Sequence, residues 1–374
     1  MSPASAQPSP PRPRLRDLGI AIGVLSPGPL NAITDVPGVR VGHCTVLWGG
    51  AESPRGEGPA RTGVTAVLPH GGDLFHERLV AGMHVANGVG EVIGGTALRE
   101  WGLLETPIML TNSQSIGLVY DATVRWMMAR DERLGIEDSC MPIVGECDDS
   151  LLNDMRGMHV RSEHAAAALD VAAAASPAAA VAEGCVGAGT GMVCFDFKGG
   201  IGTSSRIVEV YGEPCTVGVL ALCNFGDRRR LTIAGLPVGR LVPDLMPVTP
   251  QGDGAGHNEG SCIVVLATDA PLTARQCSRL AARCSLGLAS LGSYAADGSG
   301  EIMLAFSTAL RMSRTTTGPL EVATVANDAI GPLFEAAVDA TAESVANALC
   351  AAVDTDGRDG VRVYALPPER LRPR

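Results

Sequence analysis

The residues with the clearest chemical potential lie at the junction Gly260-Ser261, where a loop meets an apolar strand. The preceding stretch, 247–259, is rich in Pro, Gly and polar residues, and residues 261–267 form a near-continuous apolar run of strand length. If the chain cut itself before Ser261, that residue would become a new N-terminus. Its hydroxyl would then be a nucleophile, and its own α-amine, with a reference pKa of about 8, would be a candidate base.

Gly260 supports this interpretation, because glycine permits the strained backbone angles that an N-to-O acyl shift needs. The alternative is that Ser261 has no chemical role and that its hydroxyl simply finds a hydrogen-bond partner within the core. This is the commoner case for a serine in a buried strand. Cys262 is a rival nucleophile. Cleavage before Cys262 would leave Ser261, rather than a glycine, ahead of the bond.

A second candidate cluster follows at Ser299 and Glu301. The two residues are two positions apart at the expected start of a strand, so their side chains point the same way. A carboxylate that is bonded to one hydroxyl can orient or activate a second hydroxyl. The alternative is a turn with a solvated glutamate.

Other chemistry finds little support in the sequence. Residues 88–94 and 187–192 are glycine-rich, but they miss the spacing and the strand-to-helix context of a dinucleotide fingerprint. No P-loop, HExxH or GxSxG motif occurs, the seven histidines are dispersed, and the 11 cysteines form no CxxC pair. We therefore predict no cofactor and no metal.

Composition narrows the class of protein further. A net charge of −11 disfavours nucleic acid as a partner, and the one basic run, 228–230, is short. No stretch approaches the roughly 18 apolar residues of a membrane helix, so no membrane partner is expected. Unpaired cysteines in apolar surroundings indicate a reduced, cytoplasmic protein. Residues 1–16 are rich in Pro, Ser and Arg and predict a disordered tail.

The elements that must position these residues alternate between strands and helices. The Ala-rich stretch 163–182 predicts two short helices separated at Pro177. Residues 184–202 predict a tightly packed glycine-rich loop. The interleaving favours α/β or α+β with layered sheets, with residues 17–374 as a single catalytic domain. Strands are expected at 35–43, 64–68, 108–112, 216–223, 261–267 and 301–306, and helices at 116–128, over 277–291 and from Pro332 onwards.

Ordered motifs along the chain also resemble a known family, the DmpA-like aminopeptidases of peptidase family S58. These enzymes include L-aminopeptidase/D-amidase/esterases and β-peptidyl aminopeptidases, which process themselves into enzymes with an N-terminal nucleophile. The resemblance covers roughly residues 17–355. It rests on the motifs at 16–20, 31–43, 110–117, 187–192, 197–206, 260–272 and 300–308.

The resemblance implies a four-layer α/β/β/α sandwich of the type that this family shares with ornithine acetyltransferases. It implies self-cleavage into an α-chain that ends at Gly260 and a β-chain of residues 261–374. It also implies a homo-oligomer, a tetramer of αβ heterodimers. The implied activity is release of N-terminal residues from small peptides, amino-acid amides or esters through an acyl-enzyme on Ser261.

Site roles carry over residue by residue. The resemblance implies that Ser261 is both the cleavage-site residue and the nucleophile, and that Ser299 and Glu301 assist it. It implies that Asn224 stabilises the oxyanion, for which an amide NH₂ is chemically apt. It further implies that Glu146 holds the free ammonium group of the substrate.

One position departs from the family pattern. Several members carry a tyrosine or another aromatic residue where this chain has Asp148. A carboxylate cannot donate a hydrogen bond to an oxyanion, so Asp148 is expected to hold the substrate amine with Glu146, to bind a basic side chain, or to face solvent. Two alternative functions stay open. One is acyl transfer of the ornithine-acetyltransferase kind, whose nucleophile is threonine, and the other is a non-catalytic relative with the same fold.

Overall fold

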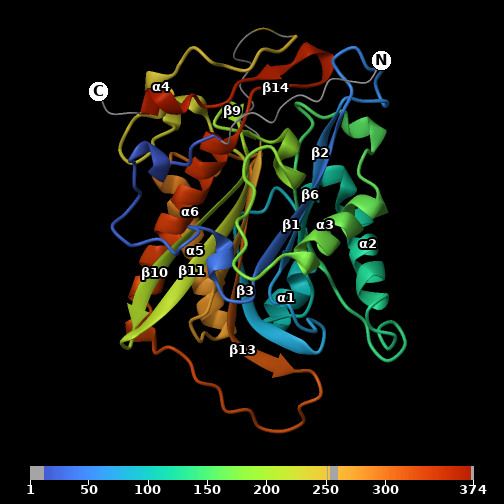
Figure 1. Ribbon diagram of the computed structural model, residues 1–374, viewed down its shortest axis with the longest axis vertical. Helices are drawn as coiled ribbons and strands as arrows, with labels where there is room; N and C mark the ends of the chain where they lie inside the picture. Colours follow the sequence, from blue (N-terminus) through green and yellow to red (C-terminus); the bar gives the residue numbers. More distant parts are fainter. Residues whose placement is uncertain (1–11, 251, 253–259, 372–374) are drawn as a thin grey trace.

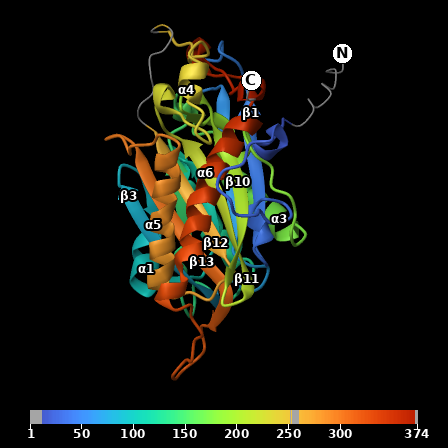
Figure 2. The ribbon, with the colours of Figure 1, turned by 90° about the vertical axis from the view of Figure 1, so that its left-hand side faces the viewer.

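Two β-sheets lie face to face in the middle of the molecule, and helices cover both outer faces (Figures 1 and 2). This computed structural model describes residues 12–250, 252 and 260–371. No helix in these ranges is long and apolar enough to cross a membrane.

The first sheet has the strand order β1-β2-β6-β7-β4. Strands β6 and β7 are parallel, and the other neighbours are antiparallel. The five strands are β1 (Arg40–Trp48), β2 (Ala60–Leu68), β6 (Ile108–Asn112), β7 (Ile143–Cys147) and β4 (Val92–Ile93).

The second sheet has the order β10-β11-β12-β13-β3-β5. Strands β12 and β13 are parallel, and every other neighbouring pair is antiparallel. Its strands are β10 (Gly200–Val210), β11 (Glu213–Asn224), β12 (Ser261–Thr268), β13 (Gly300–Ser313), β3 (Glu77–Asn87) and β5 (Leu103–Leu104).

Helices complete the four layers. Helices α2 (Ile116–Met128) and α3 (Ser162–Ala174) pack on the first sheet, and α5 (Ala274–Ser290) and α6 (Gly331–Ala351) pack on the second. Helices α1 (Gly95–Trp101) and α4 (Val238–Leu241) are short. The arrangement is the α/β/β/α sandwich that the family resemblance implied, and it agrees with the layered sheets predicted from the order of elements.

Strand β12 shows why an unbroken apolar run suits this place in the fold. Cys262, Val264 and Leu266 pack in the core beneath α5 and α6, whereas Ile263 and Val265 pack in the core between the sheets. Both faces of the strand are therefore buried, as in other strands that are covered by layers on both sides.

Short elements surround the sheets. Two small antiparallel pairs are β8 (Val193–Cys194) with β9 (Phe197–Lys198), and β14 (Thr355–Asp356) with β15 (Arg362–Val363). Single 3₁₀ turns occur at Arg16–Leu18, Ile33–Asp35, Ser113–Ser115, Met155–Gly157, Gly187–Gly191, Arg228–Arg230, Asn327–Ala329, Arg358–Gly360 and Pro368–Leu371.

Several predicted elements match these bounds and others do not. Helix α2 and strand β6 lie at their predicted residues, and β12 extends the predicted strand by one residue. The first strand begins at Arg40, because Ile33–Asp35 forms a 3₁₀ turn. The second helix expected within 163–182 is wrong: α3 ends at Ala174, and residues 178–183 form no helix. The loop expected over 184–202 contains β8, β9 and the start of β10.

The N-terminal prediction needs a correction for residues 12–16. Arg12 donates hydrogen bonds to the carbonyl oxygens of Cys350 and Leu366, and Leu15 is fully buried. These residues pack against the C-terminal part of the chain instead of forming a disordered tail. Residues 1–11 lie outside the described part of the chain.

Candidate active site

Ser261 is the first residue of β12, in the interior of the second sheet, and it is 7% exposed. Its antiparallel partner is Asn224, the last residue of β11, and its parallel partner is Gly300, the first residue of β13. Three strand ends therefore meet at one edge of the sheet. This places Asn224 and the Ser299–Glu301 segment directly beside the predicted nucleophile.

Gly260 is held closely against the end of β11. A Cβ atom at this position would come within 1.9 Å of the backbone oxygen of Asn224, so no other residue fits without moving the backbone. The carbonyl oxygen of Gly260 accepts a hydrogen bond from the backbone N–H of Gly300 at 3.1 Å. The carbonyl of the Gly260-Ser261 peptide thus faces a donor that can stabilise negative charge on its oxygen.

Ser299 and Glu301 form a buried pair, each 2% exposed. The Ser299 hydroxyl donates to Glu301 Oε1 at 2.5 Å. Glu301 Oε2 is buried and has no hydrogen-bond partner among the described residues. Burial raises the pKa of Glu301 to about 7, although the bond from Ser299 opposes the rise. The solvated glutamate considered from the sequence is therefore wrong, and the carboxyl is suited to accept and return a proton near neutral pH.

The side-chain amide of Asn224 is fixed by one contact on each atom. Its Oδ1 accepts from the backbone N–H of Val193 at 2.8 Å, and its Nδ2 donates to the carbonyl oxygen of Asp148 at 2.8 Å. Because the amide NH₂ has two hydrogens, one donor is left for a ligand. A fixed N–H donor of this kind is the type of group that can stabilise an oxyanion.

Glu146 comes to the site from β7 of the other sheet and is 6% exposed. Its Oε1 accepts from the backbone N–H of Glu91 at 2.9 Å, and its Oε2 accepts from the hydroxyl of Ser113. Burial raises the pKa of Glu146, and these two hydrogen bonds oppose the rise because they stabilise the anion.

Gly90 shows how close the two sheets bring Glu146 and Ser261. A Cβ atom on Gly90 would lie 3.3 Å from Glu146 Oε1 and 3.8 Å from the Ser261 hydroxyl oxygen. Gly90 itself is exposed, so this point is at the solvent rim of the site. A small cationic group at the rim can therefore contact the carboxylate while a neighbouring carbonyl faces the hydroxyl.

Asp148 contributes its backbone more clearly than its side chain. Its carbonyl holds Asn224, while its Oδ1 accepts from the backbone N–H of Ser150 at 2.7 Å. Asp148 is also among the charges that raise the pKa of Glu146. The side chain is half-buried and lies close enough to act electrostatically on the Glu146 carboxyl.

Cys262 does not compete with Ser261 for the nucleophile's role. The side chain is fully buried in the core beneath α5 and α6, and burial raises the pKa of its thiol. A thiol that stays neutral in an apolar core is not an effective nucleophile. All 11 cysteines are free, as the sequence predicted.

The sequence analysis did not predict several residues that contribute to the candidate site. Segment 88–94 was weighed only as a failed dinucleotide motif, yet it supplies Gly90 and the N–H of Glu91. Ser113 lies in one of the family motifs but had no assigned role, and Val193 carries no side-chain signal because it acts through its N–H.

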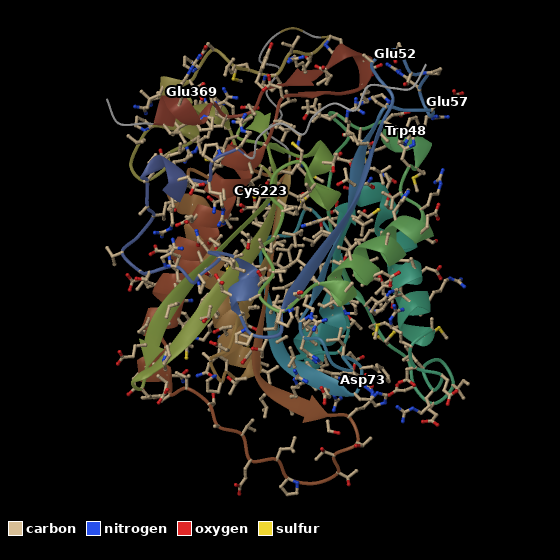
Figure 3. All side chains as sticks on the ribbon, viewed as in Figure 1. Trp48, Glu52, Glu57, Asp73, Cys223 and Glu369 are labelled. Atoms are coloured by element: carbon tan, nitrogen blue, oxygen red, sulfur yellow. The ribbon has the colours of Figure 1, made fainter. Side chains whose placement is uncertain are left out.

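A metal site does not coincide with this cluster. In the described ranges, the one group of side chains that could hold a cation is Asp73, His76 and Asp131. Figure 3 shows Asp73 at the lower end of the molecule, away from Cys223, which pairs with Cys262 next to Ser261.

The fold is that of a serine-type amide hydrolase, and the candidate site lies where strand ends of the two stacked sheets meet. The chain belongs to peptidase family S58, whose model matches residues 31–363. The resemblance inferred from the motifs is confirmed, and the protein is a serine aminopeptidase/amidase.

Named relatives agree with this membership. The chain is 44% identical to the beta-peptidyl aminopeptidase BapA of Sphingosinicella microcystinivorans, over 96% of this chain and 91% of that protein. The PH0078 protein of Pyrococcus horikoshii has a similar structure, with a TM-score of 0.90 and 46% identity over 96% of this chain and 97% of the other. The L-aminopeptidase D-Ala-esterase/amidase of Ochrobactrum anthropi, described as a variant of the Ntn hydrolase fold, gives a TM-score of 0.88 and 41% identity over the same shares.

Proposed function

We propose that the chain cuts itself between Gly260 and Ser261, and that the released Ser261 is the nucleophile of an aminopeptidase acting on small peptides, amino-acid amides or esters. One observation carries the proposal. Ser261 stands at the start of a central strand, between Asn224 and Gly300, and its hydroxyl lies across Gly90 from the Glu146 carboxylate.

Self-cleavage would begin with attack of the Ser261 hydroxyl oxygen on the carbonyl carbon of Gly260. Glu301, acting through Ser299, takes the hydroxyl proton, and the N–H of Gly300 stabilises the charge on the carbonyl oxygen. Glu301 then returns this proton to the peptide nitrogen, which leaves as the α-amine, and an ester joins Gly260 to Ser261. Water then hydrolyses this ester, which gives a carboxylate at Gly260 and a free hydroxyl and amine at Ser261.

Turnover would reuse the same groups. The ammonium group of a substrate binds Glu146, and the Ser261 hydroxyl attacks the first carbonyl carbon. The α-amine of Ser261, or Glu301 through Ser299, takes the proton, while Asn224 and a backbone N–H hold the oxyanion. The amine or alcohol product leaves, and water releases the acyl group from Ser261 as a carboxylic acid.

Two substrate classes follow from the relatives. One relative is named a beta-peptidyl aminopeptidase, and another is named for L-aminopeptidase and D-Ala-esterase/amidase activity. We propose that the Glu146 site accepts a free amine in both settings, and that Asp148 adds negative charge beside it. Measuring kcat/KM for the matched amides of L-alanine, D-alanine and β-alanine would show which substrate class the enzyme prefers.

Assembly and compartment form part of the same proposal. We expect the two fragments to remain together, because β12 is buried between β11 and β13, and to form a tetramer of heterodimers in the cytoplasm. Light scattering on the purified protein would give the mass of the particle, and a monomeric mass would contradict the tetramer.

The experiment that tests the function compares Ser261→Ala with Cys262→Ala on amino-acid p-nitroanilides. We expect Ser261→Ala to lose about a thousandfold or more of kcat/KM, and Cys262→Ala to keep most of it. Full peptidase activity in Ser261→Ala would contradict the proposal. Transfer of an acetyl group from an acetylated amino acid would favour the acyltransferase alternative, and tight binding without turnover by an uncut chain would favour the non-catalytic one.

A further inference from the structure

Gly90 lies between the two groups that we propose to hold the substrate. A Cβ atom at this position would lie 3.3 Å from Glu146 Oε1 and 3.8 Å from the Ser261 hydroxyl oxygen. The two oxygens are therefore no farther apart than these two distances together. When the ammonium group of a substrate binds Glu146 and its carbonyl carbon meets Ser261, the carbon atoms that connect them lie next to Gly90.

The segment that carries Gly90 is held against both sheets. On the side of the first sheet, the backbone N–H of Glu91 donates to Glu146 Oε1 at 2.9 Å. On the side of the second sheet, a Cβ atom on Gly300 would come within 2.2 Å of the carbonyl oxygen of Val89 and 3.1 Å of the Gly90 Cα atom. Because the segment is fixed on both sides, it cannot easily move away to make room for a side chain at position 90.

The fold itself does not require a glycine at position 90. The φ angle of Gly90 lies outside the left-handed region, and a Cβ atom there would meet no described atom closer than 3.3 Å. Gly260 differs, because a Cβ atom at that position would come within 1.9 Å of a backbone oxygen. The missing side chain at position 90 therefore leaves open space at the solvent rim, between Glu146 and Ser261.

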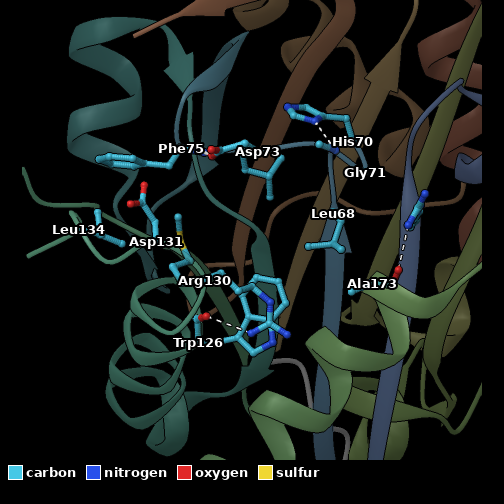
Figure 4. A pocket seen from close by; sticks show the side chains of 14 residues that line it. Leu68, His70, Gly71, Asp73, Phe75, Trp126, Arg130, Asp131, Leu134 and Ala173 are labelled. Carbon is cyan, nitrogen blue, oxygen red and sulfur yellow. Dashed lines mark hydrogen bonds between the residues drawn. The ribbon is translucent and has the colours of Figure 1, made fainter. Parts of the chain in front are cut away.

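Two hollows elsewhere do not provide this space. One hollow, beside Ser299 and Glu301, has a volume of about 10 Å³, which is about the room that one water molecule needs. The other, with a volume of about 300 Å³, is bounded by the loop after β2, by α2 and by α3 (Figure 4). It lies on the helical side of the first sheet, so that sheet separates it from Ser261 in the second sheet. A substrate that bridges Glu146 and Ser261 meets open space at the rim, beside Gly90.

We propose that Gly90 sets the length of chain that the site accepts between the amine and the reacting carbonyl, and that its missing side chain admits β-aminoacyl as well as α-aminoacyl groups. This inference rests on the proposed function, and it adds a specificity-determining residue to it. A β-aminoacyl group has one more carbon between amine and carbonyl, which adds about 1.5 Å of chain. Because both ends are held at fixed groups, the longer chain bows into the space beside Gly90.

A methyl group at position 90 occupies that space and contacts the Glu146 carboxylate. It therefore acts against the longer chain more strongly than against the shorter one. The test compares wild type and Gly90→Ala on the p-nitroanilides of glycine and β-alanine, which are both achiral and differ by a single methylene. In the wild type we expect kcat/KM values within about tenfold of each other. In Gly90→Ala, the value for β-alanine should fall at least about tenfold more than the value for glycine, as is typical of one misplaced methylene.

Gly88→Ala is the matched control. Gly88 is exposed in the same segment, its φ angle also lies outside the left-handed region, and a Cβ atom there would meet only Val85 Cγ1, at 3.6 Å. This variant should keep the wild-type ratio of the two kcat/KM values. Both variants should cut themselves as the wild type does, because self-cleavage needs no bound amine, and the two fragments on a denaturing gel also report folding.

The possible failures can be told apart. An active Gly90→Ala enzyme with the wild-type ratio would overturn this inference alone, and so would an equal change of the ratio in Gly88→Ala. If Gly90→Ala does not fold, the wild type carries the test: a kcat/KM for β-alanine more than about a hundredfold below that for glycine would show that the space does not admit the longer chain. A wild-type enzyme that hydrolyses neither anilide would overturn the proposed function and this inference with it.

Discussion

The candidate active site contains the same pair of groups twice, a serine hydroxyl bonded to a buried glutamate, in two different settings. Glu146 lies in β7 of the first sheet and Ser113 directly follows β6, whereas Glu301 lies in β13 of the second sheet and Ser299 directly precedes it. Glu146 accepts from a hydroxyl and from a backbone N–H, whereas Glu301 accepts from a hydroxyl alone and leaves one oxygen without a partner among the described residues.

The difference in hydrogen bonding agrees with the two roles that we propose, amine binding for Glu146 and proton transfer for Glu301. A carboxylate that accepts more hydrogen bonds is better stabilised as an anion, which suits a group that holds a cationic amine. A carboxyl with fewer donors has its pKa raised further by burial, and Glu301 reaches about 7, which suits a group that exchanges protons. Two serine–glutamate pairs can thus suit different tasks, cation binding or proton transfer, according to the number of hydrogen-bond donors that contact the carboxylate.

The largest effect is expected from Glu301→Gln. An amide cannot take the proton from the Ser299–Ser261 hydroxyl system, so kcat should fall about a thousandfold with little change in KM. Self-cleavage should slow by a comparable factor. Asp297→Asn, an exposed neighbour in the same turn, is the control and should behave like the wild type. Normal kcat in Glu301→Gln would contradict the proton-transfer role.

Glu146→Gln comes next. Gln can keep its contacts with Ser113 and the Glu91 N–H but removes the charge that pairs with the substrate ammonium group. We expect kcat/KM to fall about a hundredfold, mainly through KM, while self-cleavage continues, because cleavage needs no substrate amine. Steady-state kinetics and a denaturing gel measure the two effects. Loss of cleavage with an unchanged KM would reverse the roles assigned to the two glutamates.

The pH profile sharpens the comparison. The carboxyl of Glu301 is protonated below its raised pKa of about 7, and only its deprotonated form can act as a base. Activity should therefore be present above this value and be lost as the pH falls through it. In Glu301→Gln this acidic limb, the fall of kcat toward low pH, should disappear from the pH profile of the residual activity. A limb that stays in place would assign it to another group, such as the α-amine of Ser261.

The smallest effect is expected from Ser113→Ala. The hydroxyl of Ser113 stabilises the Glu146 anion, so its removal should raise the pKa of Glu146 further. We expect kcat/KM to fall about fivefold at neutral pH, with a larger loss at lower pH. Ser299→Ala, compared in the same assay, should act on kcat instead. Identical behaviour of the two serine variants would remove the distinction between the pairs.

Sequence reasoning reached the half of the site that is local to strand ends. Ser261, Ser299 and Glu301 each mark the point where a strand begins, and such points are visible in the pattern of residues. Asn224 and Glu146 became site candidates only through the family resemblance. The partners of Glu146 could not be predicted, because the Glu91 N–H and Ser113 reach it through the folding of separate segments.

The sequence analysis did not predict strands β3, β7 and β10, and β10 shows one reason, its unusual composition. Strand β10 contains Thr203, Ser204, Ser205 and Arg206, all buried, so it does not read as an apolar run. Two of these side chains find partners on α6: Arg206 pairs with Glu343 at 2.7 Å, and Ser204 donates to the carbonyl oxygen of Ala340 at 2.5 Å. Only the tertiary structure shows that α6 supplies these partners.

The central claim is that Ser261 becomes an N-terminal nucleophile, and denaturing intact-mass spectrometry of freshly purified wild-type and Ser261→Ala protein tests it most directly. We predict two fragments in the wild type, at roughly 27 and 12 kDa when the 38.5 kDa chain is divided in proportion to length, summing to the precursor plus one water, with the smaller beginning at Ser261. Ser261→Ala should give one uncut chain. A single uncut chain in an active wild-type enzyme, or cleavage at another bond, would contradict the account.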